Sequence, residues 1–328
     1  MMRKKPDSPD QQTGFWKWYH DSRLVRALLG ISPWFMRTFP RWFFHLVCYP
    51  FALFYFLFGR RFRRAVRGNL TVALGRDASP RDIRRLTWRV FSNVTKTFSD
   101  MFHVAAIPRE RLSELIAPQV GSEYIQASLE EKKGAIFLTG HIGNWELGGM
   151  ALGKFDVNVN MVYMPDQTEA FEEQRRLVRD DQNVFSIPMD GGFEVSLMVL
   201  RKLNAGEIIA LKGDRVMRGD GITVCLFGRE TLFPRGPYLL SYVSGAPILP
   251  IFLILAEDNR YIPIVAEPIF PKRTGNRSRD VLALAQKTAL VMEEYIHRYP
   301  DQWYMFYPFW KDADDSTDTS SVGTDKES

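Results

Sequence analysis

From residue 134 onward, short apolar runs alternate with longer amphipathic stretches, and this alternation constrains the fold more than any other feature of the chain. The runs have the length of strands, and the stretches have the length and periodicity of helices. The expected strands are 134–139, 158–163, 208–211, 223–227, 248–255 and 261–265. The expected helices are 80–104, which precedes the first strand, and then 145–154, 168–182, 193–204, 235–244 and 279–298. The sequence therefore predicts an α/β fold with a mostly parallel central sheet flanked by helices.

A segment of 17 residues from Trp42 to Phe58 contains no Asp, Glu, Lys or Arg. This length is at the short end of the roughly 17–25 residues that a membrane-spanning helix needs. Two arginines, Arg37 and Arg41, precede the segment, and a denser arginine cluster follows it at residues 60–67. We predict an N-terminal hydrophobic, membrane-anchoring helix, and a single span would leave the main domain in the cytoplasm. A re-entrant or interfacial helix and a buried core helix are the alternatives.

The charge of the chain is unevenly distributed. The formal net charge is +5, but residues 312–328 hold six acidic residues and one lysine, so the remainder carries a net charge of +10. A basic body favours an anionic partner, such as an acidic membrane, a phosphorylated glycolipid, an acidic carrier protein or nucleic acid. We expect four parts, which are a disordered start (1–14), an anchor with its basic flank (15–70), an α/β domain (71–311) and a disordered acidic tail (312–328).

His141 and Glu146 follow the apolar run 135–139, where a strand is expected to end. Open α/β sheets place their active sites at such strand ends. On one continuous helix a spacing of five would separate the two side chains by about 140°. Two nearby glycines indicate a turn instead, with a helix that starts near Asn144. A turn would let Glu146 accept a hydrogen bond from one ring nitrogen, while the other nitrogen takes a proton from a hydroxyl. A structural histidine is the alternative.

Two further groups of residues lie at expected element boundaries. The first is Lys212-Gly213-Asp214-Arg215, which follows the strand 208–211. Asp214 and Arg215 could position a phosphate or a sugar, or one of them could support His141. The second contains Arg235, which precedes a helix and could bind an anionic group there. A solvated turn and a plain loop are the alternatives for these two groups.

Several protein classes lack their motifs in this chain. The sequence contains no G-x-S-x-G nucleophile elbow, no H-E-x-x-H zinc motif, no Walker A loop and no recognised nucleic-acid-binding module. The two cysteines, Cys48 and Cys225, have no metal-ligand spacing and indicate a reduced, cytoplasm-facing protein. We therefore expect no metal, no permanently bound cofactor and no nucleic acid partner.

Several motifs occur in order along the chain. They are Arg63-Arg64-Ala65-Val66-Arg67-Gly68-Asn69-Leu70, the box from His141 to Glu146, Gly213-Asp214-Arg215, Phe227-Gly228, Pro234-Arg235-Gly236-Pro237, Ser244-Gly245-Ala246-Pro247-Ile248-Leu249-Pro250 and Gln302-Trp303-Tyr304. In this order they resemble the lysophospholipid acyltransferase superfamily and, within it, the bacterial lipid A biosynthesis (lauroyl/myristoyl) acyltransferase family. The resemblance covers roughly residues 30–311.

The resemblance implies a membrane-associated O-acyltransferase with an α/β fold and a hydrophobic N-terminal anchor. The implied reaction moves a fatty acyl chain from an acyl carrier protein or CoA thioester, as co-substrate, to a hydroxyl of a glycolipid or lipid precursor similar to lipid A. His141 would be the general base and Glu146 its orienting partner. Our candidates for substrate contacts are Asn144, Asp214, Arg215 and Arg235. The implied partners are acyl carrier protein and membrane lipids, at the bacterial inner membrane with the catalytic domain on the cytoplasmic side.

The C-terminal end of the chain departs from the lipid A pattern. Residues 306–310 read Phe-Tyr-Pro-Phe-Trp, where those enzymes tend to place arginines before a terminal Trp or Phe. The acceptor therefore stays open between a lipid A-like glycolipid, another glycolipid and an aryl or amino-acid lipid. Two other functions also stay open. One is an acyl-thioester or lipid hydrolase of the same fold, and the other is a non-enzymatic lipid-binding membrane protein in which the box is structural.

Overall fold

A computed structural model gives the fold of the protein. It describes residues 38–75, 78–107, 111–130, 132–151, 158–163, 184–189, 192–216 and 221–310. The segments 1–14 and 312–328, both expected to be disordered, and the helix expected at 168–182 lie outside the described residues.

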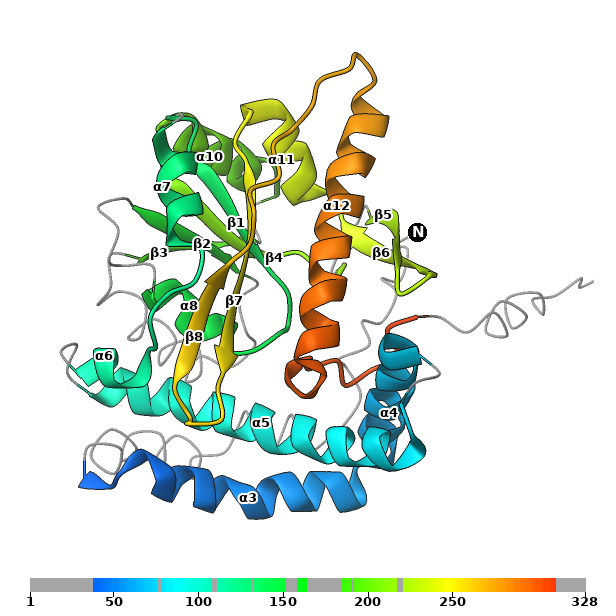
Figure 1. Ribbon diagram of the computed structural model, residues 1–328. Helices are drawn as coiled ribbons and strands as arrows, with labels where there is room; N and C mark the ends of the chain where they lie inside the picture. The colour runs from blue at the N-terminus through cyan, green and yellow to red at the C-terminus, as the bar shows by residue number, and fades with distance from the viewer. Residues whose placement is uncertain are drawn as a thin grey trace, which may run out of the picture.

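A six-stranded sheet forms the centre of the structure (Figure 1). Its strands are β1 (Ala135–Thr139), β2 (Val159–Tyr163), β3 (Val184–Pro188), β4 (Ile208–Lys212), β7 (Ile248–Leu255) and β8 (Tyr261–Val265), in the order β3-β2-β4-β1-β7-β8. Every neighbouring pair is parallel except β7 and β8, which are antiparallel. The prediction of a mostly parallel central sheet is confirmed.

Strand β1 occupies a central place in this sheet. Its continuous apolar run lets it be buried on both faces, as strands inside parallel sheets require. It pairs with β4 so that Thr139 lies opposite Lys212, the last residue of β4. Because the pairing is parallel, the segments after β1 and β4 leave the sheet at the same edge.

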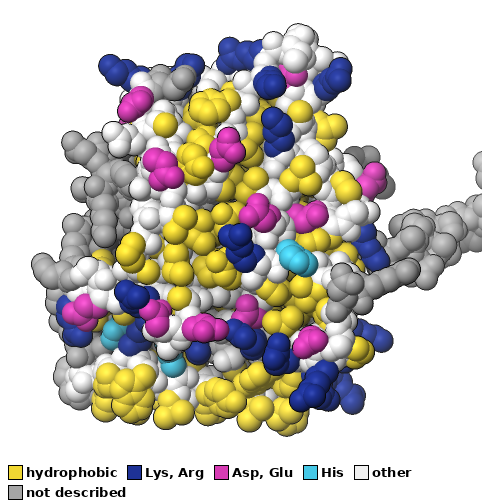
Figure 2. Space-filling view, in the orientation of Figure 1, with side chains coloured by type: hydrophobic (Ala, Val, Ile, Leu, Met, Phe, Trp, Pro, Cys, Tyr) yellow, Lys and Arg dark blue, Asp and Glu magenta, His cyan; other side chains and the backbone are white. Residues whose placement is uncertain are grey.

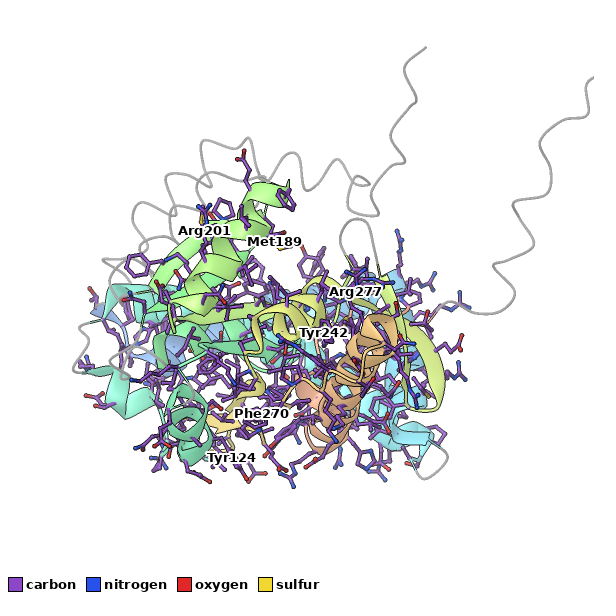
Figure 3. All side chains as sticks on the ribbon, turned by 90° about the horizontal axis from the view of Figure 1, so that it is seen from above. Tyr124, Met189, Arg201, Tyr242, Phe270 and Arg277 are labelled. Carbon is purple, nitrogen blue, oxygen red and sulfur yellow. The ribbon has the colours of Figure 1, made fainter. Side chains whose placement is uncertain are left out.

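Helices cover both faces of the sheet. On one face pack α10 (Gly192–Asn204), α11 (Gly236–Ser244) and α12 (Arg277–Arg298). On the other face packs α7 (Ser122–Glu130), through Ile125. Figure 3 shows Tyr124 of α7 and Arg201 of α10 on opposite sides of the sheet. The flanking helices are thus confirmed within the described residues.

A separate hairpin, β5 (Gly221–Leu226) and β6 (Arg229–Pro234), packs beside α12. The side chain of Gln286 on α12 bonds to the backbone N–H and carbonyl of Cys225 on β5, both at 2.8 Å. β6 and the sheet strand β3 were not predicted from the sequence. In β3 the residues between the two buried ones are exposed or half-buried, and in β6 only Phe233 is buried, so neither strand forms the continuous apolar run on which the strand prediction depended.

A long helix, α5 (Pro80–Ala106), runs past one end of the sheet (Figure 1). It begins where expected because Ser79 accepts a hydrogen bond from the Asp82 N–H and Pro80 fits the first helical turn. α3 (Arg41–Phe58) lies along the outer side of α5, and α4 (Arg60–Leu74) turns back beside it. The short elements α6 (Leu112–Leu115), α8 (Trp145–Ala151) and η4 (Pro300–Gln302) complete the described structure.

α3 is the helix expected to be an anchor, and its two faces differ. On the inner face Arg41 and His45 both bind the buried carboxylate of Asp100 on α5, at 2.6–2.7 Å. The outer face exposes large apolar side chains, which are Trp42, Leu46, Val47, Tyr49, Phe51, Leu53, Phe54, Leu57 and Phe58. They form the apolar lower edge of the molecule in Figure 2.

By length and composition α3 could cross a membrane, and it is the one such helix among the described residues. Its exposed outer face is unlike that of a core helix. Through Asp100 its inner face contacts the part of the chain beyond residue 70, where we predicted a domain boundary. That division into domains stays a prediction.

Candidate active site

The turn after β1 places His141 at the edge of the sheet. Gly143 adopts a φ of 62°, and a Cβ there would collide with the carbonyl oxygen of Leu253 on β7. Only glycine fits this close approach, because it lacks a Cβ and tolerates a positive φ. The helix α8 then starts at Trp145, as the sequence predicted.

The hydrogen-bond partner of the His141 ring is Asp214. Its Oδ1 lies 2.7 Å from Nδ1 of His141, and its Oδ2 accepts from the His141 backbone N–H at 2.6 Å. A Cβ on Gly140 would lie 3.0 Å from Oδ2, so glycine also permits this approach. Because an ionised carboxylate only accepts hydrogen bonds, Nδ1 carries the proton and Nε2 is the nitrogen that can take one.

Burial and the charge of Asp214 set the protonation of this pair. Burial lowers the pKa of His141 to about 4, against the opposing effect of Asp214. Burial alone would raise the pKa of Asp214, but His141 and the nearby Arg215 outweigh it and leave that pKa below its usual range. At neutral pH the pair is therefore a neutral imidazole held by an ionised carboxylate, which is the form that a general base needs.

Glu146 lies in the first turn of α8 and is buried. Its Oε1 accepts a hydrogen bond from Nε1 of Trp145 at 3.1 Å. The Trp145 ring in turn packs edge-on against the His141 ring, with centroids 4.9 Å apart. Nδ1 of His141 bonds to Asp214, one of the alternatives that the sequence left open. A role for Glu146 in orienting His141 stays a prediction.

Asn144 holds the start of α8 in place. It is fully buried, and its Oδ1 accepts from the Leu147 N–H at 3.3 Å, which caps the helix. Its Nδ2 donates to the Thr97 carbonyl at 3.3 Å and to the Tyr261 hydroxyl at 3.1 Å. These contacts support a positioning role, and a contact between Asn144 and a substrate stays a prediction.

The two candidate arginines lie in different places. Arg215 donates from Nη2 to the Tyr304 carbonyl at 2.8 Å, and the Tyr304 N–H donates to the His141 carbonyl at 2.8 Å. Arg215 is thus linked to His141 through the C-terminal segment. Arg235 lies at the junction of β6 and α11, with Nη2 3.5 Å from the Gly221 carbonyl on β5. The binding roles of both arginines stay predictions.

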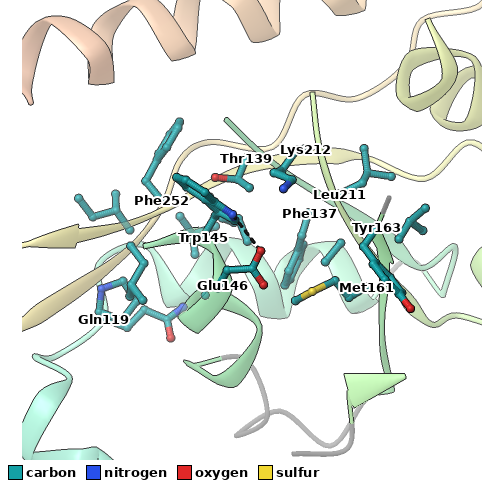
Figure 4. Close-up of a pocket in the computed structure, with 18 residues that line it drawn as sticks. Gln119, Phe137, Thr139, Trp145, Glu146, Met161, Tyr163, Leu211, Lys212 and Phe252 are labelled. Atoms are coloured by element: carbon teal, nitrogen blue, oxygen red, sulfur yellow. Dashed lines mark hydrogen bonds between the residues drawn. The ribbon is translucent and has the colours of Figure 1, made fainter. Parts of the chain in front are cut away.

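An apolar pocket lies between the sheet and α8 (Figure 4). Its walls include Phe137, Met161, Ala210, Ile251 and Val265, and it holds about 720 Å³ of empty space including its open side. Its wall also includes Trp145, through which His141 adjoins the pocket.

Four polar or charged side chains, Gln119, Thr139, Glu146 and Lys212, also line the pocket. In Figure 4 the carboxylate of Glu146 and the amine of Lys212 both point into it. In the sequence Lys212 is only part of a turn motif, and the pocket could not be predicted, because residue order does not show where packing leaves a void. Within the described part of the chain, no three His, Cys, Asp or Glu side chains gather where they could hold a metal ion.

Comparison with known proteins identifies the family. A family model described as bacterial lipid A biosynthesis acyltransferase matches residues 15–312. A phosphatidylinositol mannoside acyltransferase of Mycolicibacterium smegmatis is 25% identical over 252 residues, which are 75% of this chain and 78% of the relative. A protein of the same name from Mycobacterium tuberculosis is 25% identical over 213 residues, which are 64% of this chain and 66% of the relative. The resemblance expected from the motifs is confirmed, and the chain is an acyltransferase that belongs to the bacterial lipid A biosynthesis acyltransferase family.

Proposed function

We propose that the protein moves a fatty acyl chain from a thioester of acyl carrier protein or CoA to a hydroxyl group of a membrane glycolipid. The observation that carries this proposal is the neutral imidazole of His141, fixed by Asp214 at 2.7 Å and separated from an apolar pocket by a single aromatic ring. The family acts on lipids or glycolipids, which supplies the acceptor class. The donor and the precise acceptor are part of the proposal.

In the proposed reaction His141 is the general base. Its Nε2 takes the proton of the acceptor hydroxyl while the oxygen attacks the thioester carbonyl carbon. The tetrahedral intermediate collapses with cleavage of the C–S bond, and the imidazolium returns the proton to the leaving thiolate. The products are an ester and a free thiol. Asp214 stabilises the imidazolium that exists between these two proton transfers.

The pocket is the proposed site of the acyl chain. Its walls come from β1, β2, β4, β7 and β8, so the chain would lie across one face of the sheet beneath α8. Each methylene group buried there contributes about 0.8 kcal/mol to binding. With the chain in the pocket, the thioester carbonyl would lie near Trp145, on the side from which His141 can activate the acceptor.

α3 is the proposed contact with the membrane. Its outer face exposes Phe51, Phe54 and Phe58 by 56–71%, and exposed arginines follow on α4 (Figure 2). Its inner face is bound to Asp100 through Arg41 and His45. A spanning orientation would have to break these polar contacts or draw α5 into the bilayer. An interfacial helix, with its aromatic face in the acyl region and arginines at the headgroups, keeps them. The exposed arginines would bind the anionic headgroups of the leaflet that the helix enters. We propose the cytoplasmic leaflet of the inner membrane.

The names of the relatives indicate the chemical class of the acceptor but not the acceptor itself. The names of the mycobacterial relatives state that they acylate phosphatidylinositol mannoside. For this chain we propose a glycolipid with a free sugar hydroxyl. A lipid of that class would place its tails in the membrane beside α3 and its sugar near the sheet edge.

The test uses the purified full-length protein with a palmitoyl thioester of acyl carrier protein or of CoA. Glycolipid extracts provide acceptors, and mass spectrometry identifies the product. An acylated glycolipid that forms with wild-type protein, and not with His141→Ala, is the expected result. Free fatty acid as the sole product in the presence of every acceptor would show a hydrolase instead. Consumption of thioester by His141→Ala at the wild-type rate would overturn the assigned base.

A further inference from the structure

We infer that the ammonium group of Lys212 stabilises the negative charge that develops on the thioester carbonyl oxygen during acyl transfer. This inference rests on the proposed function, because it assigns a further residue to the same reaction. Nothing in the family match or in the names of the relatives assigns this residue.

Lys212 lies at the edge of the sheet that carries the base. It is the last residue of β4 and lies opposite Thr139 on β1. Asp214 follows it by two residues, and His141 follows Thr139 by two. Because β1 and β4 are parallel, the segments that carry His141 and Asp214 leave the sheet at the edge where Thr139 and Lys212 lie. The charge of Lys212 is close enough to add to the effect of burial in lowering the pKa of His141.

Lys212 is the cationic residue among the described residues of the pocket wall. It shares that wall with apolar side chains of β1, β2 and β4. Its Nζ lies 5.4 Å from the centre of the Trp145 ring, and the same ring contacts His141. Trp145 thus has both the cation and the base as neighbours.

The reaction itself restricts where the thioester carbonyl can lie. The acyl chain occupies the apolar interior, and the attacking oxygen must reach both Nε2 of His141 and the carbonyl carbon. The carbonyl group is therefore at the boundary between the apolar walls and the polar edge of the sheet, which is where Lys212 projects into the pocket (Figure 4). A positive charge in such a half-buried place acts on a developing oxyanion more strongly than it would in water.

Glu146, on the same wall, offers the opposite charge. Its Oε1 already accepts the Trp145 indole N–H, and a carboxylate would oppose the developing negative charge. Lys212 counteracts that repulsion. It also disfavours protonation of His141, as one of several causes that keep the pKa of this imidazole low. The second effect keeps the imidazole unprotonated before the reaction but does not help it to take the proton. The gain in rate therefore comes from the attraction between the ammonium group and the oxyanion.

The test compares Lys212→Met, which keeps the length of the side chain, with Lys212→Arg, which keeps its charge. Loss of one oxyanion-stabilising group lowers kcat by about 10²–10³-fold. We expect that loss in Lys212→Met with little change in the KM of the acyl thioester, and a smaller loss in Lys212→Arg. The slow hydrolysis of the thioester without acceptor forms the same oxyanion, so it should fall by the same factor.

The matched control is Lys202→Met. Lys202, on α10, likewise lies over an aromatic ring, that of Phe185, at 5.5 Å from its centre, but it is outside the pocket wall. We expect wild-type kinetics for this variant. A raised KM with unchanged kcat in Lys212→Met would show that Lys212 only binds the donor, and an unchanged kcat and KM would show no role. Either outcome overturns the inference while His141→Ala still tests the proposed function. If Lys212→Met does not fold, Lys212→Gln is measured against the same criteria.

Discussion

The replacement Asp214→Asn tests the central feature of the site. It keeps the shape of the side chain and removes the charge that faces the His141 ring at 2.7 Å. With charge centres about 4 Å apart and an effective dielectric constant of about 20, the attraction between this carboxylate and the imidazolium is about 4 kcal/mol. If most of this is lost, kcat falls by about 10²–10³-fold, because each 1.36 kcal/mol is a factor of ten.

A second effect of Asp214→Asn acts in the same direction. Oδ2 of Asp214 accepts from the His141 backbone N–H at 2.6 Å, and the amide oxygen of Asn would keep this bond. The amide NH₂ would then face Nδ1 and force the ring proton onto Nε2. That tautomer cannot accept a proton from a hydroxyl, so the base would be held in its inactive form.

The assay is the initial rate of acyl transfer at saturating thioester and neutral pH, with thermal unfolding measured on the same sample. The matched control is Asp280→Asn, because Asp280 is also buried and also accepts from a backbone N–H and a side-chain donor, both of Thr274, at 2.8 Å. We expect this control to keep the wild-type kcat if it folds. A folded Asp214→Asn protein with at least about a tenth of the wild-type kcat, less than 1.4 kcal/mol in the barrier, would refute the reasoning.

Three further predictions follow from the same structure. Because burial lowers the pKa of His141 to about 4, the base is already unprotonated above about pH 5, and kcat/KM should stay flat from there to pH 8. A loss of half the activity near pH 6.5, the ordinary value for histidine, would contradict this. Ala210 is a small wall residue of the pocket, so Ala210→Phe should shift the preferred acyl chain to shorter lengths in a competition between thioesters, whereas an unchanged preference would place the chain elsewhere. The joint replacement Phe54→Ser and Phe58→Ser removes two exposed aromatic side chains of α3. It should reduce the fraction of protein that sediments with anionic lipid vesicles without lowering the unfolding temperature. Binding at the wild-type level would exclude this face as the membrane contact.

The sequence was most informative where a local pattern decides the structure. The apolar run of β1, the glycine turn after it and the start of α8 at Trp145 all follow from neighbouring residues, and all were predicted. The partner of Nδ1 was harder to identify. Asp214 is 73 positions from His141 in the chain, and only the sheet order, with β4 directly beside β1, brings them together. Register and strand order depend on packing of the whole sheet, so the sequence left Asp214 as one alternative among several.

The attachment of α3 was equally hidden. Arg41 and His45, two residues of the expected anchor, both bind the carboxylate of Asp100. No local sequence pattern predicts this. An apolar segment of this length has the same composition whether it crosses a bilayer or lies on a protein surface, so the sequence does not distinguish the two. The contacts of α3 with Asp100 join residues that are far apart in the chain, so they appear only in the folded structure.

These contacts bear on how the enzyme can be handled in the laboratory. A truncation that removes the hydrophobic N-terminus, made to obtain a water-soluble fragment, would also remove Arg41 and His45. Of the three side chains that donate to the buried carboxylate of Asp100, which are Arg41, His45 and Tyr261, only Tyr261 would then be left. Removal of one partner from a buried ion pair costs about 3–5 kcal/mol, a large share of the stability of a typical domain. Tyr261 also bonds to Asn144, so the damage would extend to the turn that carries the base. Preparations in detergent or nanodiscs that retain the entire N-terminal helix pair are the ones we expect to stay folded and active.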